Sequence, residues 1–446
     1  MAELQIILNG TRRAITATPT TTLLDWLRAQ GLSGTKEGCA EGDCGACTIV
    51  LESGMSRQPV NACLCVLGQL HGRAVRTIEG LGPAHSVVAA LAEGDATQCG
   101  FCTPGIAMAA WAHARAGGDP REALAGNLCR CTGYRPILEA MAAMPDDGAS
   151  APNTAPASAS FGGFHLPATL SEAQAIRAAQ PGAWLLMGGT DLGLRFSEHR
   201  EHPAAILCLL NVAEMQGVRA TPQGQRIGAA ASYAEWLAAC RADADFAALA
   251  PFLTRLGSRQ IRALGSVAGN LGTASPIGDA LPILLALDAS VELASPRGAR
   301  RLPVAEFITG YRRNALAPDE LILAIDLPRP LPGAFLAAEK LSRRHDQDIS
   351  AVSLAACIEL EDGSIARARL AFGGMADRAI RVPEAEAALA GRALDDIAMG
   401  AAADALCLSP MTDHRATAAY RLQAARGLLR RLALRHAGLP ATVDDA

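Results

Sequence analysis

The chain has 446 residues, half of which are hydrophobic, and its formal net charge is -4. This length and apolar content suggest about three domains of roughly 150 residues, each able to bury a core, and disfavour long-range disorder. The mildly acidic charge excludes the basic footprint that nucleic-acid-binding domains usually carry. We read neither a secretory leader nor an apolar run of about 18 residues, so we expect a cytoplasmic protein without a membrane span.

The first third of the chain shows turn, cap and loop signals. A β-hairpin is expected around Asn9-Gly10, because these residues tolerate the left-handed angles of a two-residue turn. Thr22 is expected to cap a helix. The glycine-rich loop at 35–47 precedes a short strand, TIVLE, and the pattern is helical between about 85 and 144. Thr103-Pro104 marks a helix start, because proline at the first helical position loses no hydrogen bond.

Residues 147–162 are rich in Pro, Ala, Ser and Gly and contain almost no large apolar residue. Such a composition is typical of a linker, and we expect it to separate independent cores. Beyond it, strand-like runs (WLLMG, AAILCLL, QRIGAAA) alternate with helical stretches up to the prolines at 328–332. The last segment combines strand-like runs with a long amphipathic helix, whose arginines at positions 415–435 we expect to form a solvated face.

Nine of the thirteen cysteines lie between Cys39 and Cys131. Disulfides are rare in a reducing compartment, so this clustering indicates metal or redox chemistry. The four later cysteines have no spacing partner and are expected to be small buried apolar residues. They are Cys208, Cys240, Cys357 and Cys407.

The first cysteine group is Cys39-x4-Cys44-x2-Cys47, followed by Cys63 and Cys65. The C-x4-C-x2-C spacing is the plant-type ferredoxin pattern for a 2Fe–2S cluster, and the loop glycines let backbone amides approach the sulfurs. Four thiolates can also hold a structural zinc, but zinc motifs usually pair two short knuckles, whereas here three ligands share one loop. On an extended strand Cys63 and Cys65 would face the same side, so either could complete the site.

The second group consists of Cys99-x2-Cys102 and Cys129-x-Cys131. Two short pairs could also bind zinc, although Cys-x-Cys is tighter than the usual zinc knuckle. The neighbouring ferredoxin-like motif favours a second 2Fe–2S cluster.

Several motifs in the same order resemble the xanthine dehydrogenase (molybdenum hydroxylase) family. They are GCAEGDCGACTIVL, NAC, QCGFCTPGI and NLCRCTGYRPI in the first part, and LLMGGTDL, RQIRALGSVAGNLGTASPIGDALP, FITGYRR and KLSRRHDQDIS in the second. The resemblance implies an α+β multidomain protein with a β-grasp ferredoxin-like domain, a helical 2Fe–2S domain, an α+β FAD-binding domain and a C-terminal α+β domain. The expected parts are a ferredoxin-like domain at 1–83, a helical domain at 84–146, the linker at 147–162, an FAD-binding domain at 163–331 and a C-terminal flavoprotein domain at 332–446.

The resemblance also implies the ligands. The NAC match selects Cys63 and leaves Cys65 as a structural cysteine, so the metal ligands would be Cys39, Cys44, Cys47, Cys63, Cys99, Cys102, Cys129 and Cys131. The implied FAD contacts are Leu185, Leu186, Met187, Gly188, Gly189, Thr190, Asp191, Leu192, Gly265, Ser266, Gly269, Asn270, Thr273, Ser275, Asp279, Ile322 and Lys340. The implied role of Gly188-Gly189 is physically reasonable, because backbone amides without side chains can form a nest for a pyrophosphate. Tyr311 and Arg312 match positions near the site of the nicotinamide dinucleotide.

The family's electron path would then run from molybdenum on a large partner chain, through two 2Fe–2S clusters, to FAD and on to NAD. The chain resembles the family's separate small subunit, which implies a hetero-oligomer (a dimer of heterodimers) acting in purine catabolism. We expect no acid–base catalytic residue here, because the chemistry belongs to the cofactors. Two alternatives stay open: a family member acting on an aldehyde or another N-heterocycle, and a zinc-stabilised binding module with a non-flavin second half.

Overall fold

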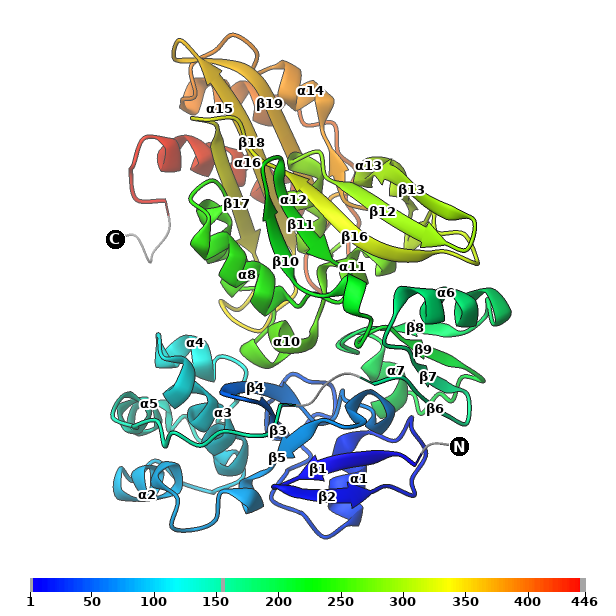
Figure 1. The fold of residues 1–446 in the computed structure, drawn as a ribbon. Helices are drawn as coiled ribbons and strands as arrows, with labels where there is room; N and C mark the ends of the chain where they lie inside the picture. The colour runs from blue at the N-terminus through cyan, green and yellow to red at the C-terminus, as the bar shows by residue number, and fades with distance from the viewer. Residues whose placement is uncertain (1–2, 154–156, 442–446) are drawn as a thin grey trace. The chain divides into compact units, whose positions relative to one another are not determined.

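The computed structural model describes residues 3–153 and 157–441, and the chain forms two compact units (Figure 1). The first comprises Met1–Gln216, Ser232–Ala234 and Gly257–Ser266, and the remaining segments make up the second. Within the described residues, no helix is both long enough and apolar enough to cross a membrane. The five-part domain division expected from the sequence remains a prediction.

The N-terminal part of the first unit is a five-stranded sheet with one helix. Its elements are β1 (Gln5–Leu8), β2 (Thr11–Ala14), α1 (Leu23–Ala29), β3 (Thr48–Ser53), β4 (Ser56–Asn61) and β5 (Ala74–Arg76). The strand order is β2-β1-β5-β3-β4, with β1 and β5 parallel. As predicted, Asn9 and Gly10 are left-handed (φ 51° and 82°) between β1 and β2. Thr22 caps α1 by accepting a hydrogen bond from the Asp25 amide (3.1 Å).

Helices follow, as the sequence predicts. They are α2 (Ser86–Glu93), α3 (Thr103–Ala116), α4 (Pro120–Leu124) and α5 (Tyr134–Ala142). Proline lies in the first turn of α3, where its missing amide proton costs no helical hydrogen bond. These helices share one buried apolar core. It contains Val87, Ile106, Trp111 and Ile137, together with Val50 of β3.

Asp146 and Asp147, which follow α5, are held by ion pairs with a buried arginine. Arg57 on β4 has a side chain that is 2% exposed, and it donates hydrogen bonds to Asp146 (3.0 Å) and to Asp147. A bridge between Gly54 and Ala151 holds the segment that follows. Composition alone indicates a linker at 147–162, and the structure shows that its start is fixed because a buried guanidinium needs carboxylate partners.

A second sheet of the first unit shares the core of the first. It contains β6 (Ala159–Phe161), β7 (Phe164–Leu166), β8 (Trp184–Leu186) and β9 (Ile206–Cys208) in the order β6-β7-β9-β8, together with α6 (Leu170–Ala179), α7 (Gly193–Ser197) and α10 (Arg259–Leu264). Phe164, Leu186 and Leu264 belong to the same buried cluster as Ile6 and Trp26. We expected the linker to separate independent cores. That expectation is wrong for the sheet that follows the linker, because the apolar side chains of this sheet are buried in the same cluster as those of the N-terminal sheet.

The second unit begins with an antiparallel five-stranded sheet in the order β10-β11-β16-β12-β13. Its strands are β10 (Val218–Thr221), β11 (Gly224–Gly228), β12 (Ser290–Ser295), β13 (Gly298–Pro303) and β16 (Leu321–Pro328). A short hairpin joins β14 (Ile308–Gly310) to β15 (Arg313–Asn314). The associated helices are α8 (Tyr233–Ala242), most of which lies in this unit, α9 (Ala250–Thr254), α11 (Val267–Thr273), α12 (Ala280–Ala286) and α13 (Val304–Phe307).

The C-terminal part is a four-stranded sheet covered by helices (Figure 1). Its elements are β17 (Phe335–Leu341), β18 (Val352–Glu361), β19 (Ser364–Gly373), β20 (Ile380–Arg381), α14 (Pro383–Ala387), α15 (Asp396–Asp404) and α16 (Ala418–His436). The expected solvated arginine face of α16 is only partly correct. Arg421 is 1% exposed and pairs with Asp413 (2.7 Å), while Arg431 and Arg435 both pair with the buried Glu339.

Candidate functional site

The first cysteine loop directs backbone amides at its own sulfur atoms. Gly42 and Gly45 adopt left-handed φ values of 78° and 67°, which let the loop fold back on itself. The amides of Glu41 and Cys44 donate to Cys39 Sγ at 3.4 and 3.3 Å, and the Cys39 amide donates to Cys44 Sγ at 3.4 Å. Such bonds stabilise a negatively charged iron–sulfur cluster and tune its potential.

The thiols of this loop occur in pairs. Cys47 Sγ lies 3.4 Å from Cys63 Sγ, and Cys39 pairs with Cys44. A hydrogen bond from the Cys44 side chain lowers the pKa of Cys39 to about 5, so one thiolate is readily available. Two thiolates on one tetrahedral metal, each at about 2.3 Å, would lie about 3.8 Å apart. The 3.4 Å separation of Cys47 and Cys63 is close to that spacing, and a second pair at Cys39 and Cys44 suits a two-iron cluster.

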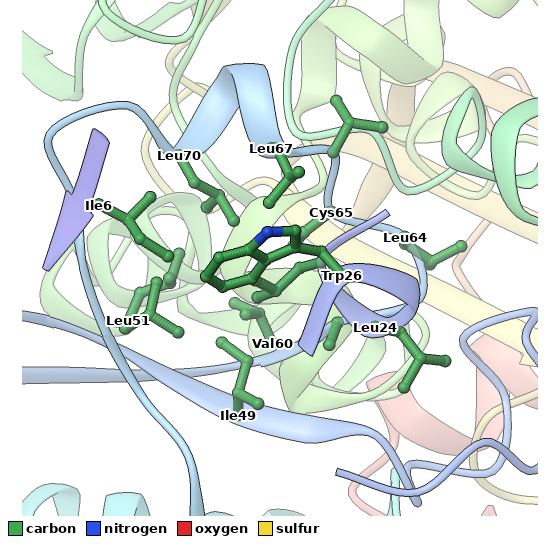
Figure 2. Close-up of a cluster of buried hydrophobic side chains, with 14 of the residues drawn as sticks. Ile6, Leu24, Trp26, Ile49, Leu51, Val60, Leu64, Cys65, Leu67 and Leu70 are labelled. Carbon is green, nitrogen blue, oxygen red and sulfur yellow. The ribbon is translucent and has the colours of Figure 1, made fainter. Parts of the chain in front are cut away.

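Cys63 and Cys65 occupy different environments, although they are two residues apart. Residues 62–64 form a turn and not an extended strand, so the two side chains do not share one side. Cys63 reaches Cys47, whereas Cys65 is fully buried among apolar residues such as Val60 and Leu67, as Figure 2 shows. Burial raises the pKa of the Cys65 thiol to about 12, and the pKa of Cys63 is raised as well, so the contact with Cys47 is what distinguishes Cys63.

The second cysteine group also forms two pairs. All four cysteines line one pocket. The side chains of Cys99 and Cys131 are hydrogen-bonded to each other, and so are those of Cys102 and Cys129. Burial and the Cys129 bond raise the pKa of Cys102 to about 12. The Cys129 amide donates to Tyr134 Oη (2.8 Å) at the start of α5. In the described part of the chain, no three Cys, His, Asp or Glu side chains surround the position of a single ion. This arrangement again suits a cluster whose irons take two thiolates each.

The glycine turn after β8 lies in the first unit and has almost no room for side chains. A Cβ atom at Gly188 would lie 1.7 Å from the Leu264 carbonyl oxygen, and Gly189 has a φ of 79°. The Thr190 Oγ1 atom would lie 3.1 Å from a Cβ placed at Gly265. Close packing of backbone on backbone therefore requires glycine in this turn, and its role as a pyrophosphate nest stays a prediction. Leu185–Asp191 thus lead directly into α7, which follows Leu192.

The other expected flavin residues lie mostly in the second unit, where they form a buried ion pair. Lys340 Nζ on β17 donates to Asp279 Oδ2 (2.7 Å) and to the Arg255 carbonyl oxygen (3.0 Å). Ser350 Oγ donates to Asp279 Oδ1 (2.5 Å). The ammonium and carboxylate are both buried, and each neutralises the other. This pair brings together two residues that the sequence suggested separately.

Helix α11 and the loop after it carry Gly269, Asn270, Thr273 and Ser275, while Ser266 precedes α11 within the first unit. Asn270 Oδ1 is buried and has no hydrogen-bond partner among the described residues, so it can accept a bond from a ligand. Ile322 is buried on β16. These features fit an FAD group that needs polar partners and close backbone approach.

Tyr311 and Arg312 form the turn between β14 and β15. Tyr311 is 55% exposed, and Arg312 has a left-handed φ of 50°. An exposed ring beside a cation can receive a planar, negatively charged ligand.

Sequence reasoning missed the residues that brace the first loop. Asn61 Nδ2 donates to the Gly42 carbonyl oxygen at 2.7 Å and so holds the loop from the end of β4. The signal was present, because Asn61 opens the NAC motif that identifies Cys63. Asn127 and Gln260, which are described below, lie in the NLCRCTGYRPI and RQIRALGSVAGNLGTASPIGDALP motifs, but the motifs alone did not show that the two residues meet.

Four family models match consecutive stretches of the chain. They are described as a 2Fe-2S iron-sulfur cluster binding domain (residues 6–68), a 2Fe-2S binding domain (77–142), an FAD binding domain in molybdopterin dehydrogenase (159–330) and a CO dehydrogenase flavoprotein C-terminal domain (337–436). The chain is also 32% identical to the xanthine dehydrogenase of Emericella nidulans over 88% of its own length and 35% of that relative. The chain belongs to the molybdenum hydroxylase family.

This molybdenum hydroxylase chain is likewise 32% identical to the xanthine dehydrogenase/oxidase of Mus musculus, covering 85% of this chain and 34% of the relative. It thus spans about one third of the length of these curated relatives. Among solved structures it is similar to the carbon monoxide dehydrogenase of Hydrogenophaga pseudoflava, with a TM-score of 0.58 and 27% identity, covering 63% of this chain and 97% of that chain. The reconstituted CO dehydrogenase from Oligotropha carboxidovorans gives a TM-score of 0.57 and 26% identity over 62% and 96%.

These matches confirm the predicted α+β multidomain class and the predicted content of two 2Fe–2S domains, an FAD-binding domain and a C-terminal flavoprotein domain. The molybdenum hydroxylase chain therefore carries the iron–sulfur and FAD domains of the family.

Proposed function

We propose that the chain is the electron-transfer part of a xanthine dehydrogenase. The observation that carries the proposal is the pairing of thiols at two sites, together with a glycine turn and a buried Lys–Asp pair at the expected flavin positions. When bound, the 2Fe–2S clusters would supply one-electron transfer, and FAD would supply the change from single electrons to a hydride.

The cluster ligands in this proposal are Cys39, Cys44, Cys47 and Cys63 for the first site and Cys99, Cys102, Cys129 and Cys131 for the second. The loop amides stabilise negative charge at the first site through the bonds to sulfur described above. In this proposal the Gly188-Gly189 turn of the first unit would receive the pyrophosphate. The Lys340–Asp279 pair of the second unit would supply polar partners to FAD.

Substrate, partner and location belong to the proposal and extend beyond the chain. Relatives named xanthine dehydrogenase support a purine substrate, and we propose that it is oxidised at a molybdenum cofactor on a large partner chain. The proposed assembly is a cytoplasmic hetero-oligomer, a dimer of heterodimers. The similarity to CO dehydrogenases supports a second candidate, a member of the same family that acts on a different substrate.

The proposed final acceptor is NAD. The exposed Tyr311 and the cation of Arg312 offer a platform and a charge partner for a negative dinucleotide. The loop at 342–350 adds further charges, including Arg344, whose backbone amide donates to Asp348 Oδ2 (2.9 Å). In the assembled enzyme, Arg312→Ala should weaken NAD use while leaving dye reduction intact. Equal effects on both acceptors would refute the NAD assignment.

The cofactor content of the purified chain tests the proposal directly. We expect the absorption spectrum of a flavin with 2Fe–2S clusters, about four irons and four acid-labile sulfides, and about one FAD per chain. Stoichiometric zinc without iron would contradict it. Purine hydroxylation should require the partner, so hydroxylation by this chain alone with bound molybdenum would overturn the two-chain arrangement.

A further inference from the structure

The two cysteine loops of the first unit touch through their backbones. The Leu128 amide, next to Cys129, donates to the Cys44 carbonyl oxygen at 2.9 Å. A Cβ atom at Gly45 would lie 2.0 Å from the Gly126 carbonyl oxygen. The two metal-binding loops therefore meet at a distance that only glycine permits, and a small shift of either loop would change their separation.

A buried network of side chains holds this meeting point. Asn127 Nδ2 donates to the Gly45 carbonyl oxygen (2.9 Å) and to Thr48 Oγ1 (3.2 Å). Gln260 Nε2 donates to Asn127 Oδ1 (2.7 Å) and to Thr48 Oγ1 (3.2 Å). The three side chains are at most 3% exposed, so water cannot replace a lost bond. Thr48 directly follows Cys47, and Asn127 lies two residues before Cys129, so the network joins both cysteine groups.

Gln260 enters this network from a distant part of the sequence. It lies on α10, within the stretch that matches the FAD binding domain. The Ser258 side chain caps α10 by accepting from the Ile261 amide (3.2 Å). Arg262, 2% exposed, donates to Glu122 on α4 at 3.0 Å. The helix is therefore anchored on both sides of Gln260, and its amide reaches Asn127 from a fixed platform.

We propose that Gln260 is a positioning residue that fixes the separation of the two cluster sites. The inference rests on the proposed function, because it assigns a purpose to the spacing of two bound clusters. The physical reason lies in the hydrogen bonds of Asn127. Its Nδ2 atom already donates to Gly45 and Thr48, and its buried Oδ1 atom needs a donor. Gln260 supplies that donor, and without it Asn127 keeps a buried unpaired acceptor and the loop before Cys129 loses its support.

Two variants of the full chain test the proposal. Gln260→Met keeps the side-chain volume and removes the donor, while Gln260→Asn keeps the amide and shortens its reach. Gln225→Met is the matched control, because Gln225 is also buried (3% exposed) but lies on β11 in the second unit. Iron and flavin contents are measured first in all chains.

Two readouts follow. Hydrogen exchange by mass spectrometry measures the peptide that contains the Leu128 amide, and we expect about tenfold faster exchange or more in both Gln260 variants. Electron paramagnetic resonance of the reduced chain measures the spin–spin splitting between the clusters, and we expect that splitting to change. The control should leave both readouts as in the wild type.

Unchanged exchange and unchanged splitting in both Gln260 variants would overturn the inference, as would equal changes in the Gln225 control. A wild-type chain that binds no iron would refute the proposed function instead. In that event the exchange measurement still decides whether Gln260 positions the two loops.

Discussion

The tie between Arg57 and the segment after α5 offers a test of what stabilises the first unit. The Arg57 side chain is 2% exposed, lies 4.0 Å above the Trp111 ring centre and bonds to Asp147. Asp147 also accepts a hydrogen bond from the Trp111 indole nitrogen (2.7 Å) and bonds to His85 Nε2 (2.9 Å). The substitution Asp147→Asn keeps the shape of the side chain and removes its charge.

The expected cost follows from the burial of the guanidinium. Removing one partner of a buried ion pair typically costs about 3–5 kcal/mol, because the other charge stays buried. Asp147 is 20% exposed and Asp146 still pairs with Arg57, so we expect a loss of about 2–3 kcal/mol of unfolding free energy. For a unit of this size, that loss lowers Tm by about 5–10 °C.

The effect should depend on pH in a defined direction. Burial alone would raise the pKa of Asp147, but hydrogen bonds from Trp111 and the Ala149 amide outweigh it and hold the pKa well below its usual range. A carboxyl group of this kind contributes stability above its unfolded pKa, near 3.8, and loses that contribution as the pH falls. The difference between wild type and Asp147→Asn should be full at pH 7 and shrink below about pH 4.

Urea unfolding followed by tryptophan fluorescence at pH 7 and pH 3 measures both effects. Glu93→Gln, which neutralises an exposed carboxylate on α2, is the control. A loss below about 1 kcal/mol, a loss equal to that of the control, or a difference that does not shrink at low pH would refute the reasoning.

Three further predictions concern the cofactor sites. Cys63→Ser should lose about half of the bound iron, whereas Cys65→Ala should keep it; the reverse result in an iron assay would show that the ligand assignment is wrong. Gly189→Val should lose FAD, because its φ of 79° strains any branched side chain, and undiminished flavin on extraction would remove the turn from the site. Lys340→Met should lower the unfolding free energy of the second unit by about 3 kcal/mol, because Asp279 keeps a buried charge; an unchanged denaturation curve would argue against that pair.

The sequence predicts the local features and the cysteine groups well, because these depend on neighbouring residues. The Asn9-Gly10 hairpin, the Thr22 cap and the strands β18 and β19 follow from turn chemistry and periodicity. Pairings between distant residues were not predictable. Arg421 was expected in solvent but is buried and pairs with Asp413. The prediction failed because the local sequence pattern does not indicate a partner outside the helix.

The same limit applies to the larger assembly of the first unit. A proline- and alanine-rich stretch indicates a flexible joint, yet Phe164 beyond it packs on Gly68, where a Cβ atom would lie 2.6 Å from the ring. Composition reports the character of the connecting chain and does not report which surfaces meet on either side of it. Likewise, Gln260 and Asn127 are ordinary polar residues in the sequence and become a buried pair only in the fold.

The packing of the glycine turn against Leu64 joins the turn to the first cysteine group. Leu64 directly follows Cys63, and a Cβ atom at Gly189 in the turn would lie 3.2 Å from the Leu64 carbonyl oxygen. The turn expected to cradle FAD therefore rests on the segment that supplies a cysteine to the first cluster. Until that segment has taken its final path, the turn lacks the surface that shapes it. A change in the path of the segment after Cys63 should therefore disturb the glycine turn as well.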